Sequence, residues 1–351
     1  MRSTALLVAL AAACSAPGPI PELAEAERHR RAGEDEAALA AYAQAQLSCR
    51  RIRDKLRRRA MCADAYLGRA ELLQDLGRTR EAADAYQEAA AVLAPDDRAS
   101  AARATLRAGQ LRLELGEDRA AYTLLWRVVT DHPDQAFAAD ALKVVLRDGR
   151  ERDPEQLYQV LGQLHGRIGG SALGDNLLHA MADLAEHERR DPARARAHLD
   201  ALVAQHPKSG LVDDALWHGA RLSRQLGDPS GAAERLRRLL ATREVAWGAG
   251  SYFSVWLDDG QLELGRVLRD DLGRHREALA AFERLPRDYP ASVLRDDALW
   301  ERAVTLHQMG ERGRACEVLA ELKRAHPDSK HELSRAPALR QELACDGPAA
   351  P

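Results

Sequence analysis

The hydrophobic positions of the chain follow turn glycines at fixed distances. After Gly227, small or apolar residues stand five, nine and twelve positions on, at Ala232, Leu236 and Leu239. Spacings of four and three place these side chains on one face of a helix, which is typical of a buried stripe. A second apolar stripe ends just before Gly227, and glycine best tolerates the left-handed conformation that follows a helix. The pattern therefore predicts two short helices joined at the glycine.

The same register recurs along the chain. It follows five further glycines: Gly33, Gly77, Gly116, Gly273 and Gly310. The 111 residues from Gly116 to Gly227 are three times the 37 that separate the last two glycines, so two more units are expected in that interval. Asp153-Pro154 and Asp191-Pro192 mark their turns, at an offset of 38 residues. A lone hairpin buries too little surface to fold, so we predict eight stacked hairpins.

A helical hairpin with glycine, alanine, an aromatic residue and alanine at these distances resembles the tetratricopeptide repeat. The second unit carries the best match: Tyr66, Ala70, Leu73, Gly77, Ala82, Tyr86 and Ala89. The resemblance covers residues 22–328 and implies an all-α fold, a right-handed superhelical solenoid of about eight hairpins. Most units lack the large aromatic residue of the first helix, and the fourth and fifth lack the turn glycine. Residues 329–351 are expected to form a C-terminal helix and tail.

A sequence pattern between repeats indicates which branch of the repeat family this chain resembles. The pattern (His/Tyr)-Pro-x-Ser-x4-Asp-x-Leu-Trp ends at Trp217 and again at Trp300. It is similar to that of periplasmic tetratricopeptide lipoproteins, such as the lipoprotein of the outer-membrane barrel-assembly machine and the Tol-Pal coordinator. The resemblance implies a non-catalytic scaffold for protein–protein interaction in the bacterial cell envelope, which acts in the assembly of an envelope or outer-membrane complex.

Residues 1–14 are typical of an export signal. Arg2 precedes a short apolar run, and three alanines before Cys14 form a small-residue cleavage site. The segment resembles a bacterial lipoprotein signal, which implies that Cys14 is acylated and that residues 15–21 form a flexible tether. The expected location is the cell envelope, lipid-anchored at the outer membrane and facing the periplasm. The alternative is an ordinary secretory signal cut nearby.

The composition fits a solenoid with charged, solvated helix faces. The 351 residues are 46% hydrophobic and 30% charged, and 51 basic and 54 acidic side chains give a net charge of -3. Charges of both signs are mixed along the chain, so nucleic acid is not an expected partner. Because repeats stack into one continuous core, this length predicts one solenoid instead of two globular domains.

Four cysteines follow Cys14 and form two local pairs, Cys49 with Cys62 and Cys316 with Cys345. An even number of cysteines in an exported chain indicates disulfides. Each bond would hold one end of the solenoid, where fraying is easiest. The alternative is four small buried thiols that fill gaps in the core.

One dense basic run lies between the first two of these cysteines: Arg50, Arg51, Arg53, Lys55, Arg57, Arg58 and Arg59. Near a lipid anchor, such a run could contact anionic headgroups or a cell-wall polymer. The balanced overall charge favours the alternative, in which the run is the solvated side of a linker or helix start.

The sixth and seventh units are separated by an insertion, residues 242–251, beside a cluster of aromatic residues that includes Trp247 and Trp256. Insertions in repeat proteins often lie on the binding face, so a partner site is one interpretation. The alternative is that the rings pack into the seam between two repeats.

No catalytic or metal-binding motif occurs in the sequence. His-Glu-x-x-His and Cys-x-x-Cys are both absent. The adjacent acids Asp213 and Asp214, and likewise Asp296 and Asp297, point apart on a helix and favour its positive end instead of sharing a proton. We therefore expect no enzyme activity, no metal and no cofactor. The alternative function is an accessory factor or enzyme of cell-wall (peptidoglycan) metabolism with an unrecognised site.

The register also places a partner-binding groove on the first helices of the hairpins. The candidate residues are Asp214, Trp217, Arg221, Arg224, Asp297 and Trp300. Each tryptophan follows the packed stripe by one residue, which turns it about 100° away from that stripe. A large ring beside mixed charges is typical of a site for a partner protein or an extended peptide. The alternative is that each tryptophan packs against the preceding repeat.

Overall fold

The computed structural model describes residues 20–249 and 255–345, and within α12 the side chains as far as residue 242. In these ranges the regular elements are all helical, and none of the helices is long and apolar enough to cross a membrane. The elements are α1 (Pro21–Ala32), α2 (Asp35–Cys49), α3 (Lys55–Asp75), α4 (Thr79–Leu93), α5 (Arg98–Glu114), α6 (Asp118–Asp131), α7 (Ala136–Arg152), α8 (Pro154–Ile168), α9 (Gly174–His187), α10 (Pro192–Gln205), α11 (Val212–Gln225), α12 (Pro229–Ala249), α13 (Leu257–Arg266), the π-helix η1 (Val267–Asp271), α14 (His275–Asp288), α15 (Arg295–Gln308), α16 (Arg312–Ala325), α17 (Lys330–Ser334) and α18 (Ala336–Glu342).

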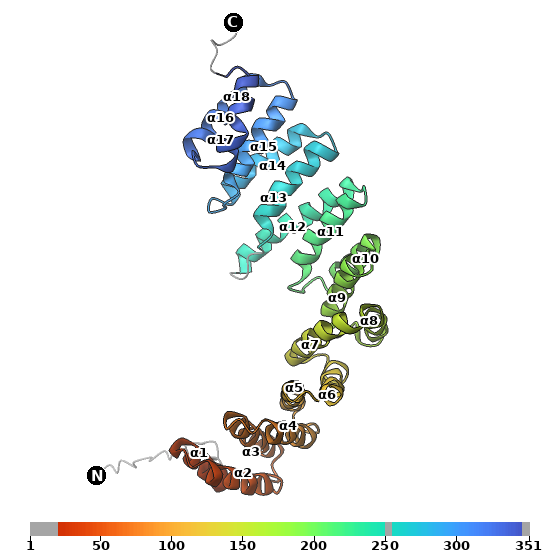
Figure 1. Ribbon diagram of the computed structural model, residues 1–351, viewed down its shortest axis with the longest axis vertical. Helices are drawn as coiled ribbons and strands as arrows, with labels where there is room; N and C mark the ends of the chain where they lie inside the picture. Colours follow the sequence, from red (N-terminus) through yellow and green to blue (C-terminus); the bar gives the residue numbers. More distant parts are fainter. Residues whose placement is uncertain (1–19, 250–254, 346–351) are drawn as a thin grey trace, which may run out of the picture. The chain divides into compact units, whose positions relative to one another are not determined.

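The first sixteen α-helices form eight successive hairpins, from α1 and α2 to α15 and α16 (Figure 1). Within the described ranges, this confirms the predicted all-α fold and the number of repeats. The second helix of a hairpin also packs against the first helix of the next one, as α4 does against α5 and α10 against α11. Where hairpins pack in this way, the apolar stripe of one is covered by the next, which is how a stack of hairpins builds a core.

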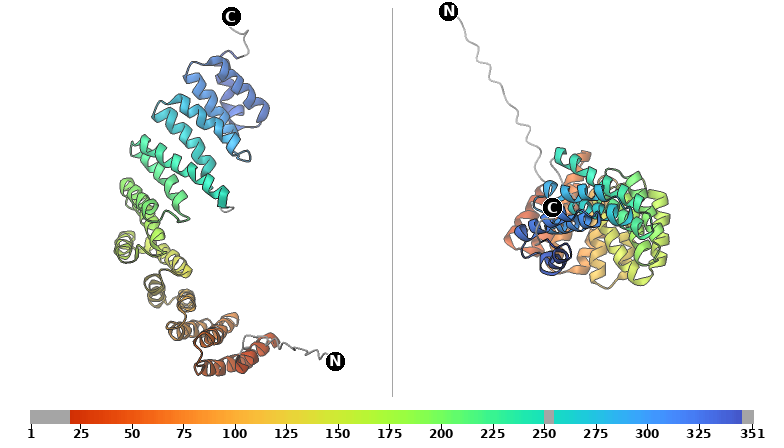
Figure 2. Two further views of the ribbon diagram at one scale, coloured as in Figure 1. Left: turned by 180° about the vertical axis from the view of Figure 1, so that it is seen from behind. Right: turned by 90° about the horizontal axis from the view of Figure 1, so that it is seen from above.

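The chain divides into two compact units, residues 1–148 and 149–351, which we call unit 1 and unit 2. The first three hairpins belong to unit 1, and the fifth to eighth hairpins belong to unit 2 (Figure 2). The boundary falls inside α7, in the fourth hairpin, which lacks the turn glycine. One solenoid over residues 22–328 was expected from the sequence, and this stays a prediction.

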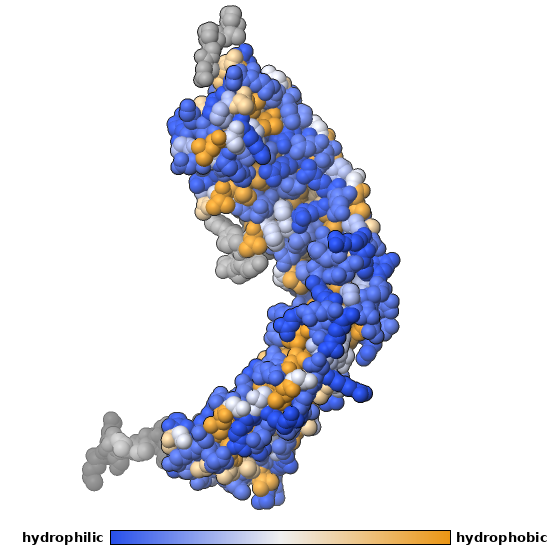
Figure 3. Space-filling view, in the orientation of Figure 1, coloured by the Kyte–Doolittle hydropathy of each residue, from blue (hydrophilic) through white to orange (hydrophobic). Residues whose placement is uncertain are grey.

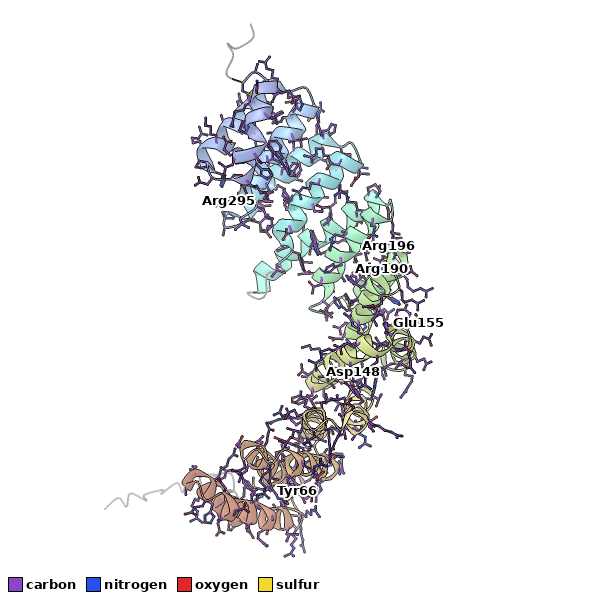
Figure 4. The ribbon with its side chains drawn as sticks, viewed as in Figure 1. Tyr66, Asp148, Glu155, Arg190, Arg196 and Arg295 are labelled. Carbon is purple, nitrogen blue, oxygen red and sulfur yellow. A yellow bond between two sulfur atoms is a disulfide. The ribbon has the colours of Figure 1, made fainter. Side chains whose placement is uncertain are left out.

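The predicted turn glycines have the backbone conformation that requires glycine. All six have φ between 65° and 75°, in the left-handed region. In the fifth hairpin this place is taken by Arg190, labelled in Figure 4, with φ of 54°. The next residue, Asp191, caps α10 by accepting a hydrogen bond of 3.0 Å from the backbone N–H of Arg194. A side-chain cap at α10 thus accompanies the turn that lacks glycine.

The apolar register is confirmed in all eight hairpins. The residues five, nine and twelve positions after each turn are buried, as Ala38, Tyr42 and Ala45 are in the first hairpin. The fourth hairpin follows the same register with Leu157, Leu161 and Leu164, although its turn contains no glycine. The stripe is therefore present in the second helix of each hairpin, with or without a turn glycine.

Both predicted disulfides are present, with S–S distances of 2.07 Å for Cys49–Cys62 and 2.06 Å for Cys316–Cys345. The alternative of four free thiols is therefore wrong. The second bond ties the end of the chain to α16, where Leu339 joins the apolar core of the last hairpin. This segment contains two short helices, α17 and α18, instead of the single helix expected.

Candidate functional site

A groove opens on the first helices of the first hairpins in unit 1. A cavity of about 620 Å³ is lined by α1 and α3, with Arg103 of α5 at its margin. Its apolar surface comes from Ala24, Ala63 and the edges of Leu23 and Leu67, two buried leucines that stand ten residues before their turn glycines. These leucines also belong to the core of unit 1, so the hairpin packing fixes their positions.

The floor of the groove depends on a glycine. A Cβ atom at Gly68 would lie 2.6 Å from the ring of Tyr42, so only glycine allows α3 to approach α2 this closely. The Tyr42 hydroxyl donates a hydrogen bond to the carboxylate of Glu27, which lines the same cavity. Burial and this neighbouring carboxylate raise the pKa of Tyr42 to about 12. Tyr42 therefore remains a neutral donor that orients Glu27.

The rim of the groove carries both charges. Glu27, Asp64 and Glu71 face it together with Arg28, Arg31 and Arg103. Arg103 pairs with Glu71 at 2.8 Å. Desolvation, and then the charge of Glu27, raise the pKa of Asp64 above its ordinary value. An apolar floor between such rims can hold apolar side chains of a peptide while the charges fix its direction.

In unit 2, Trp217 occupies the repeat position that Leu23 and Leu67 occupy in unit 1. Its ring stacks on Trp256 of the following hairpin, with centroids 5.3 Å apart and planes 10° from parallel. The indole N–H of Trp256 donates a hydrogen bond to Asp214. The structure thus brings three candidate residues together. The ring that stacks on Trp217 comes from the following repeat, and Trp217 also packs against a core cluster that includes Leu199 and Leu202 of the preceding repeat.

Trp300 repeats this arrangement at the end of unit 2. It stacks on His331, with centroids 5.4 Å apart and planes 5° from parallel. Asp297, buried in the same place, accepts a hydrogen bond of 2.9 Å from His331 and pairs with Lys330 at 2.9 Å. Burial alone would raise the pKa of Asp297, but these two donors hold it below its ordinary value.

The two candidate arginines differ. Arg224 pairs with Glu263 at 2.8 Å and with Asp271 at 2.6 Å, so it links α11 to the next hairpin. Arg221 is exposed on the surface of α11. Two further candidate residues lie outside the described part of the structure. They are the side chain of Trp247, in the inserted segment, and Cys14, in the N-terminal segment. In the view of Figure 3, the coloured surface is mostly hydrophilic with small separate hydrophobic patches.

A serine–aspartate ladder joins the hairpins of unit 2, and the sequence analysis missed it. Each serine hydroxyl donates to the first-turn aspartate of the preceding hairpin: Ser209 to Asp175 (2.5 Å), Ser292 to Asp258 (2.6 Å) and Ser329 to Asp296 (2.6 Å). The serine oxygen also accepts a hydrogen bond from the backbone N–H two residues later. The signal in the sequence was the recurrence of Ser and Asp four residues apart: Ser171 and Asp175, Ser209 and Asp213, and Ser292 and Asp296.

A second feature missed from the sequence is the π-helix η1. The segment from Asp258 to Gly273 is one residue longer than its counterparts in the neighbouring hairpins, and η1 absorbs this residue. Arg269 of η1 is buried, pairs with buried Glu301 of α15 at 2.6 Å, and lies 5.7 Å from the centroid of the Phe282 ring. This pair fixes the seventh hairpin on the eighth.

Among the described residues, one group has the composition of a possible metal site: Asp296, Asp297 and His331. Its carboxylates already accept hydrogen bonds from Ser329, Lys330 and His331, all from the entry to α17. These donors explain the cluster as the attachment of α17 to α15.

Comparison with known proteins identifies the repeat. The family model described as "Tetratricopeptide repeat" matches residues 259–292 and 297–329, the seventh and eighth hairpins. No curated protein matches the chain. Similar solved structures include YrrB, a TPR protein with an unusual peptide-binding site (15% identity, TM-score 0.43, covering 60% of this chain and 95% of that one). PilW, a type IV pilus biogenesis factor, is 14% identical (TM-score 0.37, covering 78% and 97%), and PilF of Pseudomonas aeruginosa is 15% identical (TM-score 0.38, covering 71% and 99%).

Proposed function

We infer that this chain, a tetratricopeptide-repeat protein, is a non-catalytic scaffold that binds an extended segment of a partner protein in the groove of unit 1. The observation that carries this inference is the open groove itself. Its cavity of about 620 Å³ combines the apolar surface of Leu23 and Leu67 with a rim of mixed charge. Because Gly68 and buried Tyr42 set its floor, the groove is preformed, which lowers the entropic cost of binding a peptide.

The binding is proposed to take place in the bacterial cell envelope, in the assembly of an envelope or outer-membrane complex. Two disulfides support export, because such bonds persist in oxidising compartments. The three alanines before Cys14 support acylation of that cysteine. Labelling with a fatty acid should mark the wild-type chain and not Cys14→Ser. If neither chain is labelled and both fractionate as soluble proteins, the lipid anchor is wrong.

The groove is tested by photocrosslinking with three matched alanine positions. A photoreactive residue replaces Ala24 or Ala63, which line the cavity, or Ala40, which is exposed on α2. In cells, the two groove positions should give the same discrete crosslinked band and Ala40 should not. Arg28→Glu, which reverses the charge of an exposed residue on the rim, should then weaken that band without changing the melting temperature of the chain by more than a few degrees. An identical pattern at all three positions contradicts the groove.

A further inference from the structure

The basic run of unit 1 lies in a loop that a disulfide closes. Residues 50–54 connect α2 to α3, and the Cys49–Cys62 bond joins the two helices across this loop. Ile52 packs against the core of unit 1 from inside the loop. Residues 50–56, which we call the basic loop, are thus held in place at both ends and in the middle.

Part of the basic run is already neutralised within unit 1. Arg58 pairs with Asp96 and Arg59 pairs with Asp97, each at 3.0 Å, so these two arginines attach α3 to the turn before α5. The guanidinium of Arg50 lies 5.3 Å from the centroid of the Tyr66 ring. Tyr66 is labelled in Figure 4.

The remaining cations of the basic loop face solvent. Arg51 and Arg53 are exposed, and neither makes a side-chain hydrogen bond or ion pair with the described residues. The side chain of Lys55 is 71% exposed although it lies 3.5 Å from Asp96. Beside it, Leu56 is 76% exposed, one of the most exposed large apolar side chains among the described residues. Solvated cations around an exposed apolar side chain are typical of a surface that meets lipid headgroups.

The basic loop lies at the end of unit 1 where the N-terminal segment enters. Ser48, just before the loop, donates a hydrogen bond of 2.7 Å to Glu22 in the first turn of α1. Ile20 is buried in the same core that Ile52 contacts. Six peptide units connect Cys14 to Ile20, and even fully extended they span only about 20 Å. An acyl group on Cys14 would therefore keep the basic loop close to the membrane.

We propose that the basic loop is a docking surface for anionic phospholipid headgroups. Arg51, Arg53 and Lys55 contact the phosphates while Leu56 enters the interface. The surface orients unit 1 with this end toward the membrane, and its position near the anchor rests on the acylation of Cys14 proposed above. With a net charge of -3, the whole chain is not drawn to an anionic surface, so the local cluster decides the orientation. The disulfide lowers the ordering cost of binding because the loop is already closed.

The proposal is tested on a full chain that cannot be acylated, Cys14→Ser, by sedimentation with lipid vesicles. We expect this chain to bind vesicles containing phosphatidylglycerol, not to bind vesicles of phosphatidylcholine alone, and to be released as salt is raised. Each cation at an anionic surface contributes about fivefold to binding, so Arg51→Gln with Arg53→Gln should weaken it about 25-fold. Leu56→Ser should weaken binding further.

The matched control is Arg238→Gln with Arg276→Gln, which removes the same charge from two exposed arginines of unit 2 and should leave vesicle binding unchanged. All variants carry the same N-terminal segment, so any affinity of that segment for lipid is equal in both pairs and does not affect the comparison between them. Equal loss in both pairs, or equal binding to both kinds of vesicle, overturns the proposal. Binding to cell-wall polymer without binding to vesicles also overturns it. Because the chain is not acylated, failure of the anchor and failure of the basic loop are separate results.

Discussion

The same repeat position serves two purposes in the two units. In unit 1, Leu23 and Leu67, ten residues before the turn glycine, line an open groove. In unit 2, Trp217 and Trp300 hold this position, and each is stacked against a ring from the following segment of the chain. Leu23 and Leu67 are 4% and 9% exposed and form the floor of the groove, whereas Trp217 and Trp300 remain partly exposed beside the rings on which they stack. The tryptophans thus join neighbouring segments of the chain, and the smaller leucines leave space above them.

The joints between hairpins differ in the same way. In unit 1, α3 and α5 begin with the caps Asp54 and Asp97, and Asp97 pairs with Arg59 of the preceding hairpin. In unit 2, serines form the caps or turns, and their hydroxyls reach the aspartate of the preceding hairpin. The unit 1 joint is an ion pair between half-exposed Arg59 and buried Asp97, whereas the unit 2 joint consists of short, partly buried hydrogen bonds between a hydroxyl and a carboxylate.

The largest expected difference between the units concerns ion pairs. Glu301→Ala leaves the buried guanidinium of Arg269 without its carboxylate and should cost about 3 kcal/mol of unfolding free energy. The matched change in unit 1, Asp75→Ala, removes a carboxylate that is 61% exposed from Arg30 and should cost about 0–1 kcal/mol. Chemical denaturation measures both. If both variants lose less than about 1 kcal/mol, the carboxylate of Asp270 is enough to pair with Arg269 in the absence of Glu301.

A smaller effect is expected at two glycines that face aromatic rings. A Cβ at Gly68 would lie 2.6 Å from the Tyr42 ring, and one at Gly265 would lie 2.3 Å from the Phe282 ring. Alanine at either position should cost about 1–3 kcal/mol by overpacking. Gly210→Ala is the control, because its Cβ would meet nothing within 4 Å. Both variants are then tested for the groove crosslink. If Gly68→Ala abolishes the crosslink and Gly265→Ala does not, binding depends on the close helix approach in unit 1.

Removing one ring should make unit 2 resemble unit 1. Trp256→Leu introduces the residue found at the same place in adjacent hairpins, at Leu211 and Leu294, and should cost about 0.5–1.5 kcal/mol of stacking. Trp217 should become more accessible to acrylamide quenching, while Trp126→Phe in unit 1 serves as the control for fluorescence. Unchanged quenching would show that the neighbouring repeat, not Trp256, covers Trp217.

The smallest expected effect is a pH dependence of opposite sign in the two units. Asp64 and Asp297 stand thirteen residues before their turn glycines, yet the pKa of Asp64 is raised and that of Asp297 is lowered from the ordinary 3.8. Ionised Asp297 stabilises the fold above pH 3.8, and this contribution is lost as the pH falls through its lowered pKa. Asp64 does the reverse, because stability falls as the pH rises from 3.8 through its raised pKa.

Asparagine variants measure these two contributions. Relative to wild type, Asp297→Asn should lose stability at neutral pH, and the loss should shrink in acid. Asp64→Asn should gain stability at neutral pH, and the gain should vanish in acid. Thermal unfolding at neutral and acidic pH decides the signs. Two variants with the same pH dependence would contradict the assignment of different surroundings to one repeat position.

The fold could be predicted from sequence because its determinants are local. The turn glycines, the stripe that follows them and the two cysteine pairs all lie within single hairpins or at their edges. The stacking of Trp217 on Trp256 could not be predicted in the same way, since the partner comes from a different hairpin and follows an insertion of irregular length. A one-dimensional pattern does not show which side chain of the next repeat will cover a given residue.

The sequence predicts the binding site in unit 2 because the aromatic residues are there. The groove in unit 1 is lined instead by leucine, alanine, glycine and side chains of both charges. Such residues give no distinct signal in a sequence that is 30% charged. The groove depends on the close approach of α3 to α2 at Gly68, which only the packed structure shows.

The serine–aspartate ladder has a consequence for how such a chain can grow by gene duplication. The eighth hairpin makes both bonds, because its Ser292 donates to Asp258 of the seventh hairpin and its Asp296 accepts from Ser329 of the next segment. A duplicated hairpin would therefore be joined correctly on both sides from the moment it arose. At α17 the serine is present, but the place of the aspartate four residues later is taken by exposed Leu333. The segment that begins with α17 is therefore joined to the eighth hairpin by this bond and offers no aspartate at the matching position to a further copy.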